Sequence, residues 1–503
     1  MTEKQHFLAV FWVANLGFAI AKILLTFRPE LDLFTEEAQY WLWAQNMDWH
    51  YYSKPPMVAV LNFLSTGIFG DTEFAVRFTP IVFGLATAWI VYSFAFDLYK
   101  SEKTACLAGL IFLGMPIHLL EFTFHTTDTS MTFFWTLSWY LLYRAIFSEL
   151  KGQWVIAGLI TALGIMSKLT MVLIFPASLF FLVYSGKIKS QFIPWLWFAG
   201  IAFLGFLPSL IWNIQNDFYT FKHLAALGGV SGTTPRPFDV GLLLKRTSEY
   251  FGGQLAMVSV FFLPFFFYGI KKLTAQKDYT GIYLVFPGLL TFLGFGGLSL
   301  FTFIEVNWPG FTYSTFPVFL APLVAEFGDK WKRYSQWALA ISLSLPFLFY
   351  LPNFLRWKSQ GPIFSAEKAL FKSMIGYEDL GNRIDFLRDS LEIFAPVIFS
   401  ESYHVASELA FYIKDHPQTF TVNMGSRKNQ WDLWPGMDQF VGKPEKFIFV
   451  SRNQASPEAA VRFEKLLFEE ERPFLFGKDT LGKTKIQVWE NLLEYNPKDI
   501  GTY

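Results

Sequence analysis

The sequence is poor in cysteine and in charge. One cysteine, Cys106, occurs in 503 residues, which excludes an internal disulfide framework and a cysteine-rich metal site. Charged residues make up 16% of the chain, well below the roughly 25% of ordinary soluble domains. The 41 basic and 41 acidic residues cancel, so no overall field would attract nucleic acid. These absences argue against a soluble globular protein, a disordered chain and a nucleic-acid binder.

Apolar sequence is abundant instead, with 53% hydrophobic and 20% aromatic residues. A membrane helix needs about 20 mostly apolar residues, because hydrocarbon tolerates only backbone that is hydrogen-bonded internally. Runs of this kind predict an α-helical polytopic membrane protein with about eleven transmembrane helices. They lie at 7–25, 75–97, 104–121, 128–148, 154–168, 169–185, 192–214, 251–270, 281–301, 308–328 and 333–352. The run at 57–69 is too short to span, so we expect it to lie in the interface or to re-enter the membrane.

The short loops predict an orientation, because lysine and arginine stay on the cytoplasmic side. A cytoplasmic N-terminus places Lys100 and Lys103 in a cytoplasmic loop, whereas the opposite turns around 122–127 and 302–307 contain no Lys or Arg. Eleven spans then carry the C-terminus outside. The exception to the charge rule is Lys168, at the outer turn between the fifth and sixth spans.

The composition changes after about residue 355, where apolar runs shorten and charged residues return. Strand-like runs at 395–400, 418–423, 446–450 and 485–489 alternate with helix-like stretches at 402–414 and 456–469. We therefore predict a membrane core over 1–354, with a first outer loop at 26–74, and a small soluble α/β outer domain over 355–503.

Ionisable side chains gather at the outer helix ends and in the outer loops. Such groups cost about 2.5–3.5 kcal/mol each at bilayer depth, so they need a partner or a function. A shared outer cavity would explain them together. They are Glu36, Glu37, Lys54, His125, Asp128, Lys168 and Glu305.

The two lysines are suited to a phosphate group. In YYSKPPM, two prolines fix extended backbone directly after Lys54, which would hold its ammonium as a rigid point charge. Lys168 could provide a second phosphate contact. The alternative for both is that they snorkel to the membrane interface.

The carboxylates have two interpretations. Glu36 and Glu37 could start or cap an interfacial helix at 36–46, and Asp128 could cap the span that follows it. The same groups could act as a general base on an acceptor hydroxyl. Asp128 and His125 could also bind a divalent metal ion as a cofactor.

A series of motifs, in order along nearly the whole chain, resembles the protein-mannosyltransferase-like superfamily of bacterial membrane glycosyltransferases. The relatives are the family 39 and family 83 enzymes, which include the aminoarabinose transferases acting on lipid A. The motifs are FTEEAQYWLWAQNMDWHYYSKPPMVAVLNFLSTGIFGDTEFAVR, TTDTSMTFFWTLSWYLLYRA, GIMSKLTMVLIFP, WNIQNDFYTFKH, EVNWPGFTYS, and YHVASELAFY with GSRKNQWDLWPG.

The resemblance implies a GT-C fold and assigns roles to matching positions. Glu36 corresponds to the catalytic carboxylate, usually Asp in the family, Glu37 to its acidic neighbour and Asp128 to the second acidic site residue. Lys54 and Lys168 resemble contacts to a carrier phosphate. Tyr52, Glu305 and Asn307 are further candidates for substrate binding. Arg427, Asn429 and Gln430 could recognise the acceptor, close over the cavity or cap an exposed loop.

The function implied is transfer of a monosaccharide from a polyprenyl-phosphate carrier, such as undecaprenyl phosphate, to an envelope acceptor. The acceptor would be lipid A or another lipopolysaccharide or glycan, reached on the periplasmic side, with inversion at the anomeric carbon. The chain would be a multi-pass protein of the bacterial inner membrane, with a cytoplasmic N-terminus and a periplasmic C-terminal domain. The alternatives are a transporter or flippase of a lipid-linked sugar, and a protein O-glycosyltransferase; the sugar and the acceptor stay open.

Overall fold

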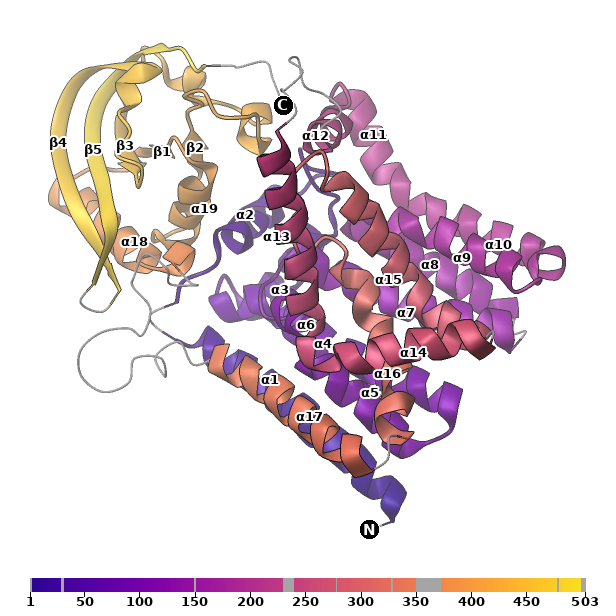
Figure 1. Ribbon diagram of the computed structural model, residues 1–503. Coiled ribbons are helices and arrows are strands. Elements are labelled where there is room, and N and C mark those ends of the chain that lie inside the picture. Colours follow the sequence, from indigo (N-terminus) through magenta and orange to yellow (C-terminus); the bar gives the residue numbers. More distant parts are fainter. Residues whose placement is uncertain are drawn as a thin grey trace. The chain divides into compact units, whose positions relative to one another are not determined.

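The computed structural model describes residues 2–28, 31–148, 151–228, 239–276, 278–326, 329–349, 372–476 and 479–498. The chain is mostly helical, with a small sheet formed by its C-terminal part (Figure 1). It divides into two compact units, and each is described by itself. The first unit contains Met1–Leu25, Lys54–Val58 and Arg77–Tyr350, and the second contains Thr26–Ser53, Ala59–Val76 and Leu351–Tyr503.

The first unit is a bundle of helices. In it α8 contacts both α7 and α10, and α5 contacts α16 and α17. The elements that run mainly through this unit are α1 (Glu3–Thr26), α4 (Glu73–Tyr99), α5 (Glu102–Gly114), α6 (Pro116–Glu121), α7 (Thr127–Phe147), α8 (Lys151–Ser167), η1 (Leu169–Leu173), α9 (Ile174–Tyr184), α10 (Ile188–Phe203), η2 (Leu204–Phe206), α11 (Leu207–Gln215), α12 (Tyr219–Leu227), α13 (Val240–Val258), η3 (Val260–Phe262), α14 (Leu263–Gln276), α15 (Tyr279–Leu298), η4 (Gly310–Thr315), α16 (Phe316–Glu326) and α17 (Asp329–Phe349).

Four of the described helices are long and apolar enough to cross a membrane, judged by length and composition. They are Glu3–Thr26, Glu73–Tyr99, Ile188–Gln215 and Tyr279–Leu298. The other predicted spans fall on shorter or more polar helices, such as α7, α8 and α16. The chain is thus a multi-pass membrane protein, and the number of eleven spans stays a prediction.

The predicted span at 251–270 is not one straight helix, because the chain breaks there. Helix α13 ends at Val258, and the segment that follows is bent from it by 76°. Ser259 at the break has φ 73°, in the left-handed region, and its hydroxyl lies 3.0 Å from that of Ser342 on α17. Pro264 lies five residues after Ser259 in this apolar run, at the second residue of α14, and is the one local signal of the break.

The second unit contains a five-stranded sheet in the order β2-β1-β3-β5-β4. Strand β1 pairs in parallel with β2 and with the central strand β3, and β5 pairs antiparallel with β3 and β4. Apolar side chains of α18 and α19 pack on one face of the sheet, and a cluster rich in phenylalanine covers the other. The elements are α2 (Thr35–Gln45), α3 (Met57–Phe69, which begins in the first unit), α18 (Tyr377–Ser390), α19 (Tyr403–Tyr412), β1 (Val397–Ser400), β2 (Thr419–Thr421), β3 (Lys446–Ser451), β4 (Val461–Phe476) and β5 (Asp479–Tyr495), with short 3-10 turns η6 (Lys372–Met374), η7 (Gln430–Leu433), η8 (Met437–Phe440) and η9 (Pro457–Ala459).

The strands predicted from the sequence are confirmed, and so is the helix at 402–414, which is α19. The predicted helix at 456–469 is wrong: most of it is β4, which pairs with β5 from Val461 opposite Tyr495 to Phe476 opposite Asp479. Glutamate, lysine and leucine favour a helix locally, but pairing along the long hairpin overrides that preference. The predicted domain boundary near residue 355 lies outside the described residues.

Helix α2 of the first outer loop packs against α19 in the core of the second unit. Ala38, Trp41 and Leu42 of α2 form one buried cluster with Ala410 and Phe411 of α19. The position of α2 is therefore fixed by apolar burial against the C-terminal part of the chain.

Candidate functional site

Asp128 is the centre of a buried polar cluster in the first unit. Its Oδ1 accepts a hydrogen bond from Lys168 Nζ at 2.6 Å, and its Oδ2 accepts one from Asn307 Nδ2 at 2.8 Å. The side chains of Lys168 and Asp128 are only 12% and 8% exposed. Charge-assisted hydrogen bonds in such a site are shorter and stronger than neutral ones. Three residues predicted as site residues therefore meet, although they are far apart in the sequence.

Each member of this cluster lies where a helix begins or ends. Asp128 is in the first turn of α7, Lys168 separates α8 from η1, and Asn307 precedes η4. The cap of α7 is Thr126, so the predicted capping role of Asp128 is corrected to a place within the first turn. A carboxylate there is still stabilised by the positive end of the helix dipole.

The predicted metal site is not supported. His125 is fully buried, and both carboxyl oxygens of Asp128 accept hydrogen bonds from Lys168 and Asn307. Among the residues that the structure describes, no three His, Cys, Asp or Glu side chains are placed to hold a metal ion. The partners of Asp128 are a cation and an amide, and a metal ion on its carboxylate would compete with both.

Two other candidates in the first unit lie closer to the surface. Lys54 is half-buried, and Pro55 and Pro56 connect it to the start of α3 at Met57. Glu305 is exposed, two residues before Asn307. The structure leaves both as candidates for contact with a substrate.

Burial distinguishes Glu36 from Glu37, which lie in the second unit. Glu37 is fully buried, and its Oε2 accepts a hydrogen bond from the backbone N–H of Phe34 at 2.9 Å, as in a capping box. Glu36 is half-buried, and its Oε2 accepts one from the Tyr40 hydroxyl at 3.2 Å. Glu37 is thus committed to the start of α2, whereas Glu36 keeps a partly accessible carboxylate.

The candidates near residue 430 have different surroundings. Gln430 is buried, and its Oε1 accepts a hydrogen bond from the backbone N–H of Tyr52 at 2.6 Å. The side chain of Asn429 caps η7 by accepting from Trp431 N–H at 2.9 Å. Arg427 is exposed. Gln430 and Asn429 therefore organise the outer loop segments, and Arg427 is the one of the three whose side chain is open to a ligand.

A second polar pair in the first unit is not among the residues predicted from the sequence. His118 and Glu121 are both buried on α6, with His118 Nδ1 3.0 Å from Glu121 Oε2. Thr129 fastens the end of α6 to α7, because its hydroxyl donates to the Glu121 carbonyl oxygen at 2.6 Å. Two ionisable residues three apart inside an apolar run are the signal that could have identified this pair.

Gly310, three residues after Asn307, lies directly against this pair. A Cβ at Gly310 would lie 2.5 Å from Ile117 Cγ1 and 2.9 Å from Glu121 Oε1. We expect Gly310→Ala to displace the segment that carries Asn307 and to lower activity, because close-packed neighbours cannot yield without strain. The measurement is turnover by the purified protein beside its melting temperature.

The matched control is Gly294→Ala on α15, where a Cβ would meet nothing within 4 Å. This change should leave activity intact and slightly favour the helix. Equal turnover for Gly310→Ala and Gly294→Ala would show that the contact with Glu121 has no effect on the site.

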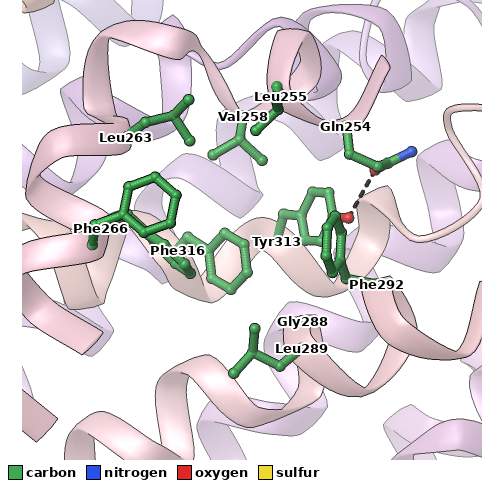
Figure 2. Close-up of a pocket in the computed structure, with 11 residues that line it drawn as sticks. Gln254, Leu255, Val258, Leu263, Phe266, Gly288, Leu289, Phe292, Tyr313 and Phe316 are labelled. Carbon is green, nitrogen blue, oxygen red and sulfur yellow. Dashed lines mark hydrogen bonds between the residues drawn. The ribbon is translucent and has the colours of Figure 1, made fainter. Parts of the chain in front are cut away.

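An apolar cavity of about 180 Å³ lies between α13, α14, α15 and the η4–α16 segment (Figure 2). Leucine and phenylalanine side chains such as Leu289 and Phe316 line it. Gln254 is its polar end: Tyr313 donates to Gln254 Oε1 at 2.7 Å, and Gln254 Nε2 donates to Val306 O at 2.8 Å. Val306 directly precedes Asn307, so Gln254 connects the cavity to the segment that carries Asn307.

Comparison with known proteins supports a relationship in sequence. The family model for dolichyl-phosphate-mannose-protein mannosyltransferases matches residues 53–212. A protein of Rhizobium johnstonii named lipid A galacturonosyltransferase is 25% identical over 244 residues, which are 48% of this chain and 50% of that protein. The Yersinia enterocolitica undecaprenyl phosphate-alpha-4-amino-4-deoxy-L-arabinose arabinosyl transferase is 30% identical over 217 residues, 39% of this chain and 38% of the relative. The chain thus spans about half, or less, of the length of these relatives.

The likeness in structure covers nearly the whole chain. The crystal structure of ArnT from Cupriavidus metallidurans bound to undecaprenyl phosphate matches with a TM-score of 0.68, covering 99% of this chain and 100% of that one. The sequence identity is 11%, so this match establishes the fold alone. The chain thus shares the fold of ArnT and is similar in part of its sequence to membrane glycosyltransferases, as its motifs predicted.

Proposed function

We propose that this protein is a glycosyltransferase that moves a monosaccharide from a polyprenyl-phosphate carrier to lipid A or a related envelope glycan. The observation that carries the proposal is the buried Lys168–Asp128–Asn307 cluster in a chain with the fold of an undecaprenyl-phosphate-binding protein. The names of the sequence relatives support both the carrier and the acceptor class.

Lys168 is the proposed contact to the carrier phosphate, and Lys54 is the second. A buried ammonium already paired with Asp128 is held in one position, which suits stabilisation of charge on a leaving group. Asn307 fixes the other oxygen of Asp128, so the pair cannot rotate freely. Glu305 is exposed, two residues before Asn307, and is available to a polar substrate group.

The donor is held at two ends in this proposal. Its phosphate lies at the lysines, and the apolar cavity that ends at Gln254 suits part of an isoprenoid chain. The aromatic and aliphatic lining offers burial to hydrocarbon and no charged group. The polar end of the cavity leads through Val306 to Asn307, which fits a ligand whose head is anionic.

The reaction exchanges one bond at the anomeric carbon for another. The acceptor oxygen bonds to the anomeric carbon from the face opposite the phosphate, and the bond from that carbon to the phosphate oxygen breaks. The electron pair leaves with the polyprenyl phosphate, and the acceptor proton goes to the Glu36 carboxylate. Inversion follows from attack on the opposite face, as in inverting glycoside hydrolysis. An acceptor that is itself a phosphate would already be ionised and would need no base.

The reaction side in this proposal is the periplasm. The N-terminus and the loops rich in lysine lie in the cytoplasm, and the second unit lies outside the inner membrane. The exposed Arg427 is then available to an acceptor in the outer leaflet, and the buried Tyr52, whose backbone N–H donates to Gln430, lies in the same unit. Arginine recognises phosphate groups well, and lipid A carries such groups.

The test is a transfer assay with the purified protein in lipid vesicles. Undecaprenyl phosphate that carries a radiolabelled sugar is supplied together with lipid A. The products are separated by chromatography, and their masses are measured by mass spectrometry. We expect labelled lipid A and free undecaprenyl phosphate in equal amounts. Cleavage without any labelled acceptor, or no cleavage with a set of amino-sugar, pentose, hexose and uronic-acid donors, would contradict the proposal.

One observation favours transport of the lipid-linked sugar as a second candidate. The α13–α14 pair is bent by 76°, and broken helices near the membrane centre are common in transporters. A transporter would move the labelled donor between leaflets without breaking its phosphate ester. The same vesicles, assayed for movement of intact donor, therefore separate the two functions.

A further inference from the structure

Glu408 on α19 is a fully buried carboxyl group whose side chain the proposed chemistry does not use. Its exposed fraction is 0%. In the described part of the chain, neither Oε1 nor Oε2 has a hydrogen-bond partner. Burying a polar group in this way costs free energy, and burying it as a charged group costs far more. A buried carboxyl group without a hydrogen-bond partner is unusual in a folded protein.

The charged surroundings of Glu408 are mostly acidic. The groups that act on it are the carboxyls of Asp32, Glu37 and Glu73 and the guanidinium of Arg452. The three other carboxyls have donors: Asp32 accepts from Tyr377 N–H at 2.6 Å, Glu37 from Phe34 N–H, and Glu73 from the Tyr412 hydroxyl. Glu408 alone among these four lacks one, so it is the group least able to hold a negative charge.

The nearby cation is engaged elsewhere. The Arg452 guanidinium carbon lies 3.7 Å from the Tyr377 ring centroid and 4.2 Å from that of Phe474. Its Nη2 donates to the Ile375 carbonyl oxygen at 2.8 Å. Arg452 thus weakens the repulsion around Glu408 without forming a salt bridge to it.

These surroundings determine the protonation of Glu408. Burial, and then the charge of Asp32, raise the pKa of Glu408 well above the usual range of a glutamic acid. Burial also raises the pKa of Asp32, to about 6. The neutral carboxylic acid is therefore the favoured form of Glu408, whereas Asp32 is largely ionised at neutral pH.

The location of Glu408 connects its protonation to Glu36. Helix α19 packs on α2, where Ala38 and Trp41 are buried against Ala410 and Phe411. The first turn of α2 contains Glu36 and Glu37, and the charge of Glu37 acts directly on Glu408. A second negative charge at this contact would repel Glu37 from its place at the start of α2.

We propose that Glu408 is a positioning residue: as a neutral acid it keeps the first turn of α2, and with it Glu36, in place, and its ionisation at alkaline pH releases that turn. The effect on turnover rests on the proposed function, in which Glu36 accepts the acceptor proton. The effect on α2 does not depend on that function. The titratable and charged groups facing Glu408 are Asp32 before α2, Glu37 on α2, Glu73 on α4, Tyr377 on α18, Tyr412 on α19 and Arg452 after β3.

The sign of the pH dependence follows from linkage. The pKa of a glutamic acid in the unfolded chain is about 4.3. Above that pH the folded state still binds the Glu408 proton, whereas the unfolded state does not. The free energy of unfolding therefore falls as pH rises through the raised pKa of Glu408. Asp32 contributes in the same direction but only up to about pH 7, because its pKa is about 6. A fall in the free energy of unfolding above pH 7 that is absent from the Glu408→Gln variant would therefore be due to Glu408.

The experiment compares wild type with Glu408→Gln, Glu408→Ala and the control Glu458→Gln, an exposed glutamate on η9. Transfer to a hydroxyl acceptor is measured from pH 6.5 to 9.5. Wild type and Glu458→Gln should lose about tenfold per pH unit on the alkaline limb, as expected when one group must stay protonated. Glu408→Gln, which copies the neutral acid in shape, should keep the neutral rate and lose that limb. Glu408→Ala should be slow throughout.

A second measurement does not need activity. Amide hydrogen exchange in residues 35–45, corrected for the intrinsic pH dependence, should lose protection above pH 7 in wild type but not in Glu408→Gln. An alkaline limb in Glu408→Gln equal to that of wild type, or equal loss of protection in both, overturns the proposal. If no protein transfers sugar at any pH, the proposed function fails, and the exchange measurement alone decides on Glu408.

Discussion

Replacing Glu36 by Gln should lower the rate of sugar transfer to a hydroxyl acceptor by about 10²–10⁴-fold, the usual contribution of a general base. The carboxylate is half-buried and has the Tyr40 hydroxyl as a hydrogen-bond donor. An amide of the same shape keeps that contact but cannot accept a proton. The fold should be unaffected, because a single hydrogen bond to a partly accessible group contributes little to stability. Release of polyprenyl phosphate and the melting temperature, measured on one preparation, check both parts.

The matched comparison is Glu37→Gln, one residue further along the same helix. Its carboxylate is fully buried and accepts from the Phe34 N–H, a contact that the Gln amide oxygen can also make, so this change should cost little stability. Its turnover should fall less than that of Glu36→Gln. The opposite pattern, with Glu37→Gln stable but inactive and Glu36→Gln active, would transfer the role of base to Glu37.

The size of the rate loss in Glu36→Gln should depend on the acceptor. With a phosphate acceptor, no proton has to be removed, and Glu36→Gln should turn over close to the wild-type rate. A large loss with both acceptor types would indicate that Glu36 orients the substrate instead. The pair of acceptors thus separates proton transfer from positioning.

The helices could be predicted because their signal is local. The apolar run at 57–69 is α3 without any change of bounds, since two prolines precede it and a glycine follows. The break at Ser259 was missed because an apolar run that contains one proline, Pro264, also suits a spanning helix, in which proline is tolerated. β4 was predicted as a helix because its conformation depends on pairing with β5, which the local residues do not encode.

The site was predictable in residue type but not in geometry. An ionisable residue at an outer helix end signals function, and this rule identified Asp128 and Lys168. Nothing in the spacing indicates that Asn307, 179 positions after Asp128, completes the cluster. Burial alone distinguishes Glu36 from Glu37, and Glu408 looks like any surface glutamate on an amphipathic helix until α2 covers it. Such information exists only after long-range packing.

Removing one charge of the buried pair Lys168–Asp128 should lower both stability and catalysis. Lys168→Met leaves Asp128 with one donor in place of a cation, so we expect a loss of about 3–5 kcal/mol, as for other broken buried ion pairs. Asp128→Asn should destabilise in a similar way, because it leaves a buried ammonium unpaired. Both single variants should be inactive.

The double variant Asp128→Asn with Lys168→Met removes both charges together, and much of the stability should return, since an uncharged pair avoids the desolvation penalty. Transfer should not return, because the leaving phosphate would still lack its cation. Melting temperatures and turnover of the four proteins form a double-mutant cycle that measures the coupling in each property. The control Lys245→Met removes an exposed charge on α13 and should change neither property. If the double variant regained both stability and transfer, the pair would serve only the fold, and the phosphate contact would have to be sought at Lys54.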